Sequence, residues 1–219
     1  MTDEALAPVP AAEADEGLFT PRYLRKIDPG VASVIDVGVN HGTPALYRAF
    51  ARLPFLLVDP QQGADARLNV RPRDYRFANV AVGASPGSLT IHEEGGRSTA
   101  LERTALTRAR DTDTYQAEMT TLDLLIDAFA LPAPIGLKID TEGFELEVLK
   151  GLDRHAADVG FVICECSVRR RFVGGYAMAD LVGALKAKGF DVFNFLNPPK
   201  EKPTFYDMLF LRSDHPLFG

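Results

Sequence analysis

The stretch over residues 34–42 reads Val-Ile-Asp-Val-Gly-Val-Asn-His-Gly and constrains the fold more than any other part of the chain. An apolar run over residues 31–37 reaches a turn spaced by glycines, and the residues that follow predict a helix. This arrangement is typical of a nucleotide-type cofactor site in an open α/β sheet. Gly38 and Gly42 allow a tight turn close to a ligand. Asp36 places a carboxylate at the carboxyl end of the strand, where such sheets bind ligands.

The glycine spacing favours one kind of cofactor. It is Asp-x-Gly-x-x-x-Gly, so Asn40 stands where a dinucleotide-binding turn has its second glycine. A pyrophosphate needs that glycine for close approach of the backbone. A ligand with an amino acid and a nucleoside but no phosphate does not, and S-adenosylmethionine (SAM) is such a ligand. We therefore expect SAM rather than NAD, with a tight turn that binds no ligand as the alternative.

The composition is that of a single globular domain, with 219 residues, 46% of them hydrophobic and 25% charged. Residues 1–17 hold five acidic residues, no Lys or Arg, and repeated Ala and Pro. They lack the positive start and apolar stretch of a secretory signal, so we predict a disordered acidic tail before one domain over residues 18–219.

Charge and cysteine content exclude several classes of protein. The formal net charge is −6 and the tail carries five of those charges, which argues against a general nucleic-acid-binding protein. No apolar run approaches the roughly 18 residues of a membrane span. Cys164 and Cys166 lie two apart in a predicted strand and point to one face, so reduced thiols in a cytoplasmic protein are expected.

Strands and helices alternate along the chain, which predicts a mostly parallel sheet with helices on both faces. A hairpin at the end requires one antiparallel strand. A polar stretch over residues 95–114 is read either as a lid that grips an anionic or sugar acceptor, through Arg97, Arg103, Arg108 and Arg110, or as a solvated loop. The predicted strands are 31–37, 55–59, 75–82, 88–94, 115–120, 135–140, 161–167, 191–196 and 206–212, and the predicted helices are 19–27, 43–51, 122–129, 142–150 and 178–185.

Acidic residues follow two of the predicted sheet strands. Asp59 ends the second strand, where an acid accepts hydrogen bonds from both ribose hydroxyls in such folds, although it could simply begin a turn before Pro60. Asp140 ends a later strand, and Glu142 and Glu145 fall in the first turn of the helix predicted after it. Acids at a helix start usually stabilise the helix, but three at the mouth of a site also suit the sulfonium and ammonium groups of SAM.

Several stretches together resemble the FkbM-type family of SAM-dependent methyltransferases. The resemblance covers about residues 31–168. The family usually has Glu before the proline that ends the second strand, where this chain has Asp59. The matching stretches are Ile-Asp-Val-Gly-Val-Asn-His-Gly (35–42), Val-Asp-Pro (58–60), Asn-Val-Ala-Val-Gly (79–83), Thr-Leu-Asp (121–123), Leu-Lys-Ile-Asp-Thr-Glu-Gly-Phe-Glu (137–145), Leu-Lys-Gly (149–151) and Phe-Val-Ile-Cys-Glu (161–165).

The resemblance implies a class I methyltransferase fold, a Rossmann-like sheet of seven strands in the order 3-2-1-4-5-7-6 with strand 7 antiparallel. It also implies mostly O-methylation, so we expect the acceptor to be a hydroxyl on a sugar, a glycan or a small natural product. Carried over to this chain, the first turn would line the methionine end of SAM, Asp59 the ribose, and the end of the third strand the adenine. The implied cofactor-binding residues are Asp36, Gly38, Asn40, Gly42, Asp59, Asn79, Ala81 and Asp140.

Methyl transfer needs an aligned acceptor and a base, and His41, Asp140 and Glu142 are the candidates. Near a helix N-terminus His41 would remain a neutral base, although it could be a surface histidine. Asp140 and Glu165 could instead hold Mg²⁺, but we expect turnover without metal. A non-catalytic SAM-binding module and an NAD-dependent oxidoreductase are the alternative functions.

Overall fold

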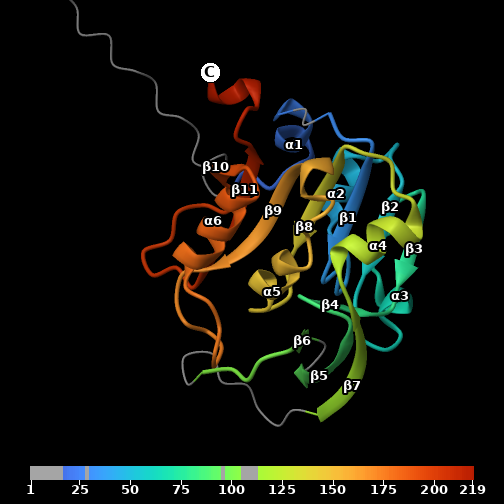
Figure 1. Cartoon of the computed structure of the whole chain (residues 1–219). Helices are drawn as coiled ribbons and strands as arrows, with labels where there is room; N and C mark the ends of the chain where they lie inside the picture. Colours follow the sequence, from blue (N-terminus) through green and yellow to red (C-terminus); the bar gives the residue numbers. More distant parts are fainter. Residues whose placement is uncertain (1–16, 28–29, 95–96, 105–112) are drawn as a thin grey trace, which may run out of the picture.

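A sheet of seven strands organises the chain (Figure 1). The computed structural model describes residues 17–27, 30–94, 97–104 and 113–219, so the predicted acidic tail lies outside the described residues except for Gly17. The strands of this sheet, in spatial order, are β10 (Phe190–Phe195), β11 (Phe205–Arg212), β9 (Val159–Ser167), β8 (Ile135–Ile139), β1 (Ser33–Val37), β2 (Phe55–Val58) and β3 (Tyr75–Ala78).

The strand pairing confirms the predicted class I methyltransferase topology. All neighbouring pairs from β9 to β3 are parallel, whereas β11 runs antiparallel to both β9 and β10. Counted within this sheet alone, the order is 3-2-1-4-5-7-6, and the antiparallel strand is the one the closing hairpin required. The order reverses at β1, which lies between β2 and β8, and open α/β sheets bind ligands at such a switch point.

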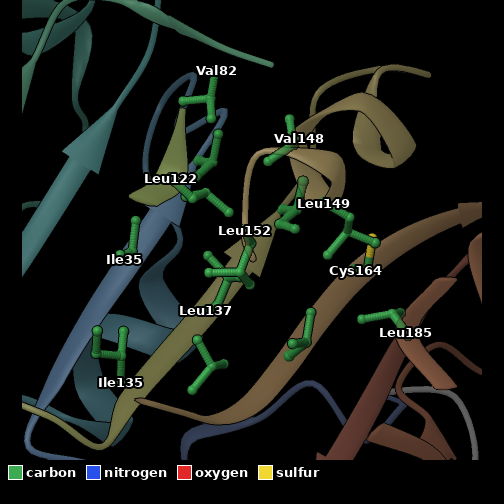
Figure 2. Packing of buried hydrophobic residues seen from close by; sticks show 14 of the residues in the cluster. Ile35, Val82, Leu122, Ile135, Leu137, Val148, Leu149, Leu152, Cys164 and Leu185 are labelled. Atoms are coloured by element: carbon green, nitrogen blue, oxygen red, sulfur yellow. The ribbon is translucent and has the colours of Figure 1, made fainter. Parts of the chain in front are cut away.

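Apolar side chains cover both faces of the sheet, because successive side chains along each strand point to opposite faces. Along β1 and β8, Ile35 and Leu137 contribute to one core cluster and Val34 to the other. Figure 2 shows Leu122, Leu149 and Leu152 packed beside Ile35 and Leu137 in the first of these clusters. The second cluster includes residues of the first two helices. Helices therefore lie on both faces, as predicted.

The helices are short, and in the described part of the chain none is long and apolar enough to cross a membrane. Cys164 and Cys166 are buried free thiols, as expected. The α-helices are α1 (Pro21–Ile27), α2 (Pro44–Ala49), α3 (Ala64–Arg67), α4 (Leu122–Phe129), α5 (Glu145–Lys150) and α6 (Met178–Ala187), and the 3-10 helices are η1 (Ala156–Asp158) and η2 (Pro216–Phe218).

A second sheet of four strands was not predicted and lies in the lower part of Figure 1. The single strand expected over 75–82 is wrong, because the chain leaves the large sheet at Asn79. The amide of Asn79 donates to the carbonyls of Asp59 (2.7 Å) and Gln61 (2.9 Å) and holds the turn. The strands of the second sheet are β4 (Ala81–Val82), β7 (Asp113–Thr120), β5 (Gly87–Glu94) and β6 (Arg97–Thr99).

Two further expectations about local structure need correction. The polar stretch 95–114 is not wholly irregular, because it contains β6 and the first residues of β7. Arg108 and Arg110 of the proposed lid lie outside the described residues. The helix expected to begin at Glu142 begins at Glu145 instead. Glu142 adopts a left-handed conformation with φ 51°, and a helix cannot include it.

His155, just before η1, contacts two carboxylates with its two ring nitrogens. Its Nδ1 lies 2.7 Å from Asp158 Oδ2, and its Nε2 lies 2.9 Å from Asp127 Oδ1 on α4. Hydrogen bonds to Asp158 and then Asp127 raise the pKa of His155 above its ordinary value. The protonated ring therefore stabilises the folded chain more than the neutral ring does.

We predict that this contribution depends on pH. A histidine with a raised folded pKa gives its full extra stability below its unfolded pKa of about 6.5 and loses it as pH rises through the folded value. Urea unfolding at pH 5.5 should show His155→Gln less stable than the wild type. At pH 9, the internal control, the difference should shrink. A difference that stays constant or grows with pH would contradict this account.

Candidate active site

A cavity lies between the carboxyl ends of β1, β2 and β8 and the second sheet. The space between these elements is about 710 Å³, including its open mouth. Its wall contains polar and apolar side chains from both sheets. The lining residues are Val37, Gly38, Asn40, Asp59, Pro60, Gln61, Val80, Ala81, Val82, Leu89, Ile91, Ser98, Thr99, Ala100, Asp140, Thr141, Glu142 and Phe144.

Gly38 brings the loops after β1 and β8 into direct contact. Its φ is 77°, and a Cβ added there would lie 1.8 Å from the carbonyl oxygen of Asp140. No other residue could occupy this position without moving the backbone. The Gly38 N–H donates to the carbonyl of Val58 at 2.8 Å, so the turn is also bonded to the end of β2. The floor of the cavity is therefore built from three strand ends held together.

Asp59 holds the backbone on both sides of the cavity floor. Its Oδ2 accepts the N–H of Asn40 at 3.0 Å, and its Oδ1 accepts the N–H of Gln61 at 2.9 Å. Burial raises the pKa of the Asp59 carboxyl, while these two N–H groups act in the opposite direction. The side chain lines the cavity at the end of β2. It can accept further hydrogen bonds there, because each carboxylate oxygen has two lone pairs.

A buried ion triad connects β1 with β8. Asp36 and Lys138 are partners across the two strands, and Lys138 Nζ lies 3.2 Å from Asp36 Oδ1 and 3.4 Å from Asp140 Oδ2. Asp36 Oδ2 also accepts the hydroxyl of Tyr47 on α2 at 2.8 Å. Burial opposes the charge on Lys138, but the carboxylates, Asp36 foremost, outweigh it and raise the pKa of the amine. Asp36 thus faces its partners and does not line the cavity.

Two acids of the loop after β8 do line the cavity. Glu142 Oε2 lies 3.3 Å from Arg103 Nη2 and 3.5 Å from Arg171 Nη1, so it is held by two guanidinium groups. Asp140 is more open, with 32% of its side chain exposed against 17% for Glu142. Arg171 also pairs with Glu165 of β9. Asp140 is therefore the carboxylate more accessible to an entering molecule.

The structure brings some of the residues singled out from the sequence together and separates others. His41 is exposed, with Nδ1 3.3 Å from the carbonyl of Arg67, and lies outside the cavity wall. Gly42 packs instead against the backbone of Val70. The expected site residues that line the cavity are Gly38, Asn40, Asp59, Ala81, Asp140 and Glu142, and those that do not are Asp36, His41, Gly42 and Asn79.

A family model for the methyltransferase FkbM domain matches residues 36–192, which is more than half of the chain. The chain belongs to the FkbM methyltransferase family. It is therefore a SAM-dependent methyltransferase, and the expectation of SAM rather than NAD is confirmed. The matched region contains every cavity-lining residue.

Several solved structures are similar to this FkbM chain at low sequence identity. The N-terminal domain of EvdMO1 in the presence of SAH and D-fucose is 11% identical, covering 88% of this chain and 80% of that one, with a TM-score of 0.46. Magnesium protoporphyrin IX methyltransferase (ChlM) from Synechocystis PCC 6803 with bound SAM is also 11% identical, covering 95% and 87%, with a TM-score of 0.45. Against the longer EvdMO1 chain the match spans only 39% of that chain. No curated protein sequence matches.

The residues of the cavity fit SAM. Asn40 Oδ1 and Thr141 Oγ1 are buried in its wall and have no hydrogen-bond partner in the described part of the chain. Buried polar atoms are nearly always bonded, so a polar ligand or water in the cavity would complete the hydrogen bonding of these two. The carboxylates of Asp59, Asp140 and Glu142 suit a ligand that carries a sulfonium and an ammonium. The FkbM cavity thus offers the polar atoms and the charge that SAM requires.

The sequence did not reveal every residue of the cavity wall. Thr141 lies inside the motif around Asp140, so the motif could have indicated it. The side chains from the second sheet could not be found, because nothing local shows that β5 and β6 fold back over the strand ends. The lining residues that sequence reasoning missed are Val37, Pro60, Gln61, Val80, Val82, Leu89, Ile91, Ser98, Thr99, Ala100, Thr141 and Phe144.

We predict that Asp59→Ala weakens SAM binding by roughly 1.5–3 kcal/mol, the scale of hydrogen bonds to a charged group. The reason is that the carboxylate would no longer meet the ribose or hold the N–H groups of Asn40 and Gln61. Calorimetry should show a dissociation constant raised about tenfold to a hundredfold. Asp74→Ala, at an exposed position before β3, is the matched control. An unchanged constant for Asp59→Ala would place the ribose contact elsewhere.

Proposed function

We propose that this methyltransferase acts on oxygen, and that its acceptor is a hydroxyl on a sugar, a glycan or a small natural product. The observation that carries the proposal is the position of Asp140. Its partly exposed carboxylate lines the cavity at the end of β8, and its backbone carbonyl lies against Gly38 in the turn after β1. A hydroxyl needs a base as it is methylated, and Asp140 is placed to act as one.

The chain has two tasks in such a reaction. SAM, when bound, supplies a methyl group attached to a sulfonium sulfur. After the transfer, that sulfur is part of a neutral thioether, which is a good leaving group. The protein must align the acceptor oxygen with that methyl and accept its proton. We assign proton removal to Asp140, from which the proton passes to solvent through the open mouth of the cavity. Glu142, held by two arginines, can accept a hydrogen bond from a second hydroxyl of the acceptor.

The cavity wall near these acids supports a polyhydroxylated acceptor. Ser98 and Thr99 of β6 add hydroxyl groups to the wall, and Thr99 Oγ1 donates to the carbonyl of Glu142 at 2.8 Å. Hydrogen-bonding side chains from two directions suit a molecule with several hydroxyl groups. His41, the third candidate base, lies outside the wall, so we assign the base to Asp140.

The acceptor class can be tested directly. The protein is incubated with SAM and separate panels of sugars, small phenols, lipids and matched amines, and release of S-adenosylhomocysteine is measured. Release with hydroxyl acceptors and recovery of a methyl ether would support the proposal. Release with amines alone would overturn O-methylation, and no release with any panel would favour a SAM-binding module.

We predict that Asp140→Asn lowers kcat by about 10²- to 10⁴-fold, the contribution typical of a positioned general base. The amide keeps the shape of the side chain but cannot accept the proton. Asp214→Asn, at an exposed position after β11, is the matched control and should keep wild-type turnover. If Asp140→Asn keeps its turnover and His41→Gln loses it, the general base is His41 and not Asp140.

A metal-assisted route is the main alternative for activating the hydroxyl. Carboxylate oxygens of Asp140, Glu145 and Glu165 lie within 4.8 Å of one another. Glu145 already accepts two backbone N–H groups and the hydroxyl of Tyr176, and Glu165 pairs with Arg171. These contacts engage both oxygens of Glu145 and one oxygen of Glu165, and Mg²⁺ demands near-ideal octahedral geometry.

We therefore predict that excess EDTA leaves turnover unchanged. The assay compares initial rates before and after chelation, with added Mg²⁺ as the restoring condition. A rate abolished by EDTA and recovered with Mg²⁺ would show a metal route and make Asp140 and Glu165 the ligands to mutate.

A further inference from the structure

The loop that carries Asp140 and Glu142 has a conformation that needs outside support. Glu142 has a φ of 51° and Gly143 a φ of 101°. A residue with a Cβ rarely adopts the left-handed region, so Glu142 must be held there by its surroundings. A Cβ at Gly143 would lie 2.3 Å from the ring of Phe172, which closes the loop from one side. The direction of both cavity acids depends on this backbone.

Glu145, at the start of α5, bonds the loop on both sides of Glu142. Its Oε1 accepts the N–H of Thr141 at 2.9 Å and the N–H of Gly143 at 3.0 Å. The residue is fully buried and does not line the cavity. A single carboxylate oxygen thus fixes the two peptide groups that flank Glu142. Hydrogen bonds from N–H groups to a charged acceptor are stronger than neutral ones.

Tyr176, from the segment before α6, fixes the other oxygen of the same carboxylate. Its hydroxyl donates to Glu145 Oε2 at 2.7 Å. It also accepts the N–H of Ser167 at 3.4 Å and lies 3.0 Å from the carbonyl oxygen of Glu165, so it is tied to β9. Like Glu145, it lies outside the cavity wall. The contacts therefore link the rigid sheet to the cavity loop through two buried side chains.

We infer that Glu145 and Tyr176 are positioning residues for methyl transfer, which hold Asp140 and Glu142 toward the acceptor. This inference rests on the roles proposed above for those two acids. Neither Glu145 nor Tyr176 touches the cavity, so neither takes the proton or binds SAM. Their effect is on alignment, where a displacement of about 1 Å can cost about a hundredfold in rate.

Three variants test the inference, and Tyr75→Phe, at a hydroxyl bonded to Asp65 on the protein surface, is the matched control. Glu145→Ala should lower kcat about tenfold to a hundredfold and change the dissociation constant of SAM by less than about threefold. Tyr176→Phe should lower kcat by about tenfold, since the carboxylate is then held from one side only. Tyr75→Phe should keep wild-type kcat.

Glu145→Gln separates positioning from proton transfer or metal binding. Its amide oxygen can accept both loop N–H groups, and its NH₂ can donate to the Tyr176 oxygen. We expect kcat to return to within about fivefold of wild type. If Glu145→Gln loses as much activity as Glu145→Ala, the charge itself is required and the inference is wrong. Should Glu145→Ala not fold, Glu145→Gln and Tyr176→Phe still decide the question.

Amide hydrogen exchange at Thr141 and Gly143 gives a readout that needs no acceptor. Both amides should exchange faster in Glu145→Ala than in the wild type, and near the wild-type rate in Glu145→Gln. Unchanged exchange in Glu145→Ala would overturn the inference even if hydroxyl methylation is correct. Conversely, if only amines are methylated, the exchange result and the kcat series on an amine still test Glu145 and Tyr176 separately from the proposed function.

Discussion

The ammonium group of Lys138 joins the two strands at whose ends the cavity lies. It is 4% exposed, and it contacts Asp36 on β1 and Asp140 at the end of β8. Removing one partner from a buried ion pair typically costs about 3–5 kcal/mol, because the other charge is left uncompensated. Asp36 also accepts a hydrogen bond from the hydroxyl of Tyr47, which connects these strands to α2. The geometry of the cavity floor therefore depends on one amine and its carboxylates.

This constraint explains why loops far apart in the sequence can form one site. Gly38 touches the Asp140 backbone, and Asp59 bonds the turn after β1 to the turn after β2. The second sheet then closes the cavity from the opposite side. Rigid strand ends hold the cofactor side of the cavity, whereas Glu145 and the arginines around Glu142 hold the acceptor side in our account. Asp140 belongs to both sides, because it contacts Lys138 and Gly38 in the floor.

Much of the fold could be predicted from the sequence, and the site only in part. Alternating strands and helices predicted a mostly parallel sheet, and the strand order followed from the resemblance to the FkbM family. The direction of a side chain at a strand end could not be predicted, because it depends on the register between strands. Asp36, for example, is the partner of Lys138 across the strands and does not line the cavity. An acid such as Glu142 is typical of the first turn of a helix. The helix begins later, because Glu145 accepts hydrogen bonds from the N–H groups of the residues on both sides of Glu142. The amide of Asn79 turns the chain out of the sheet, which no local pattern showed.

We propose that SAM lies along the cavity floor, with its ribose at Asp59 and its methyl group toward Asp140. A crystal structure of the protein with S-adenosylhomocysteine tests it most directly. We expect both ribose hydroxyls to lie within hydrogen-bond distance of the Asp59 carboxylate, and the sulfur to lie closer to Asp140 than to Asp59. A ribose bonded elsewhere, or a sulfur that faces away from Asp140, would contradict it.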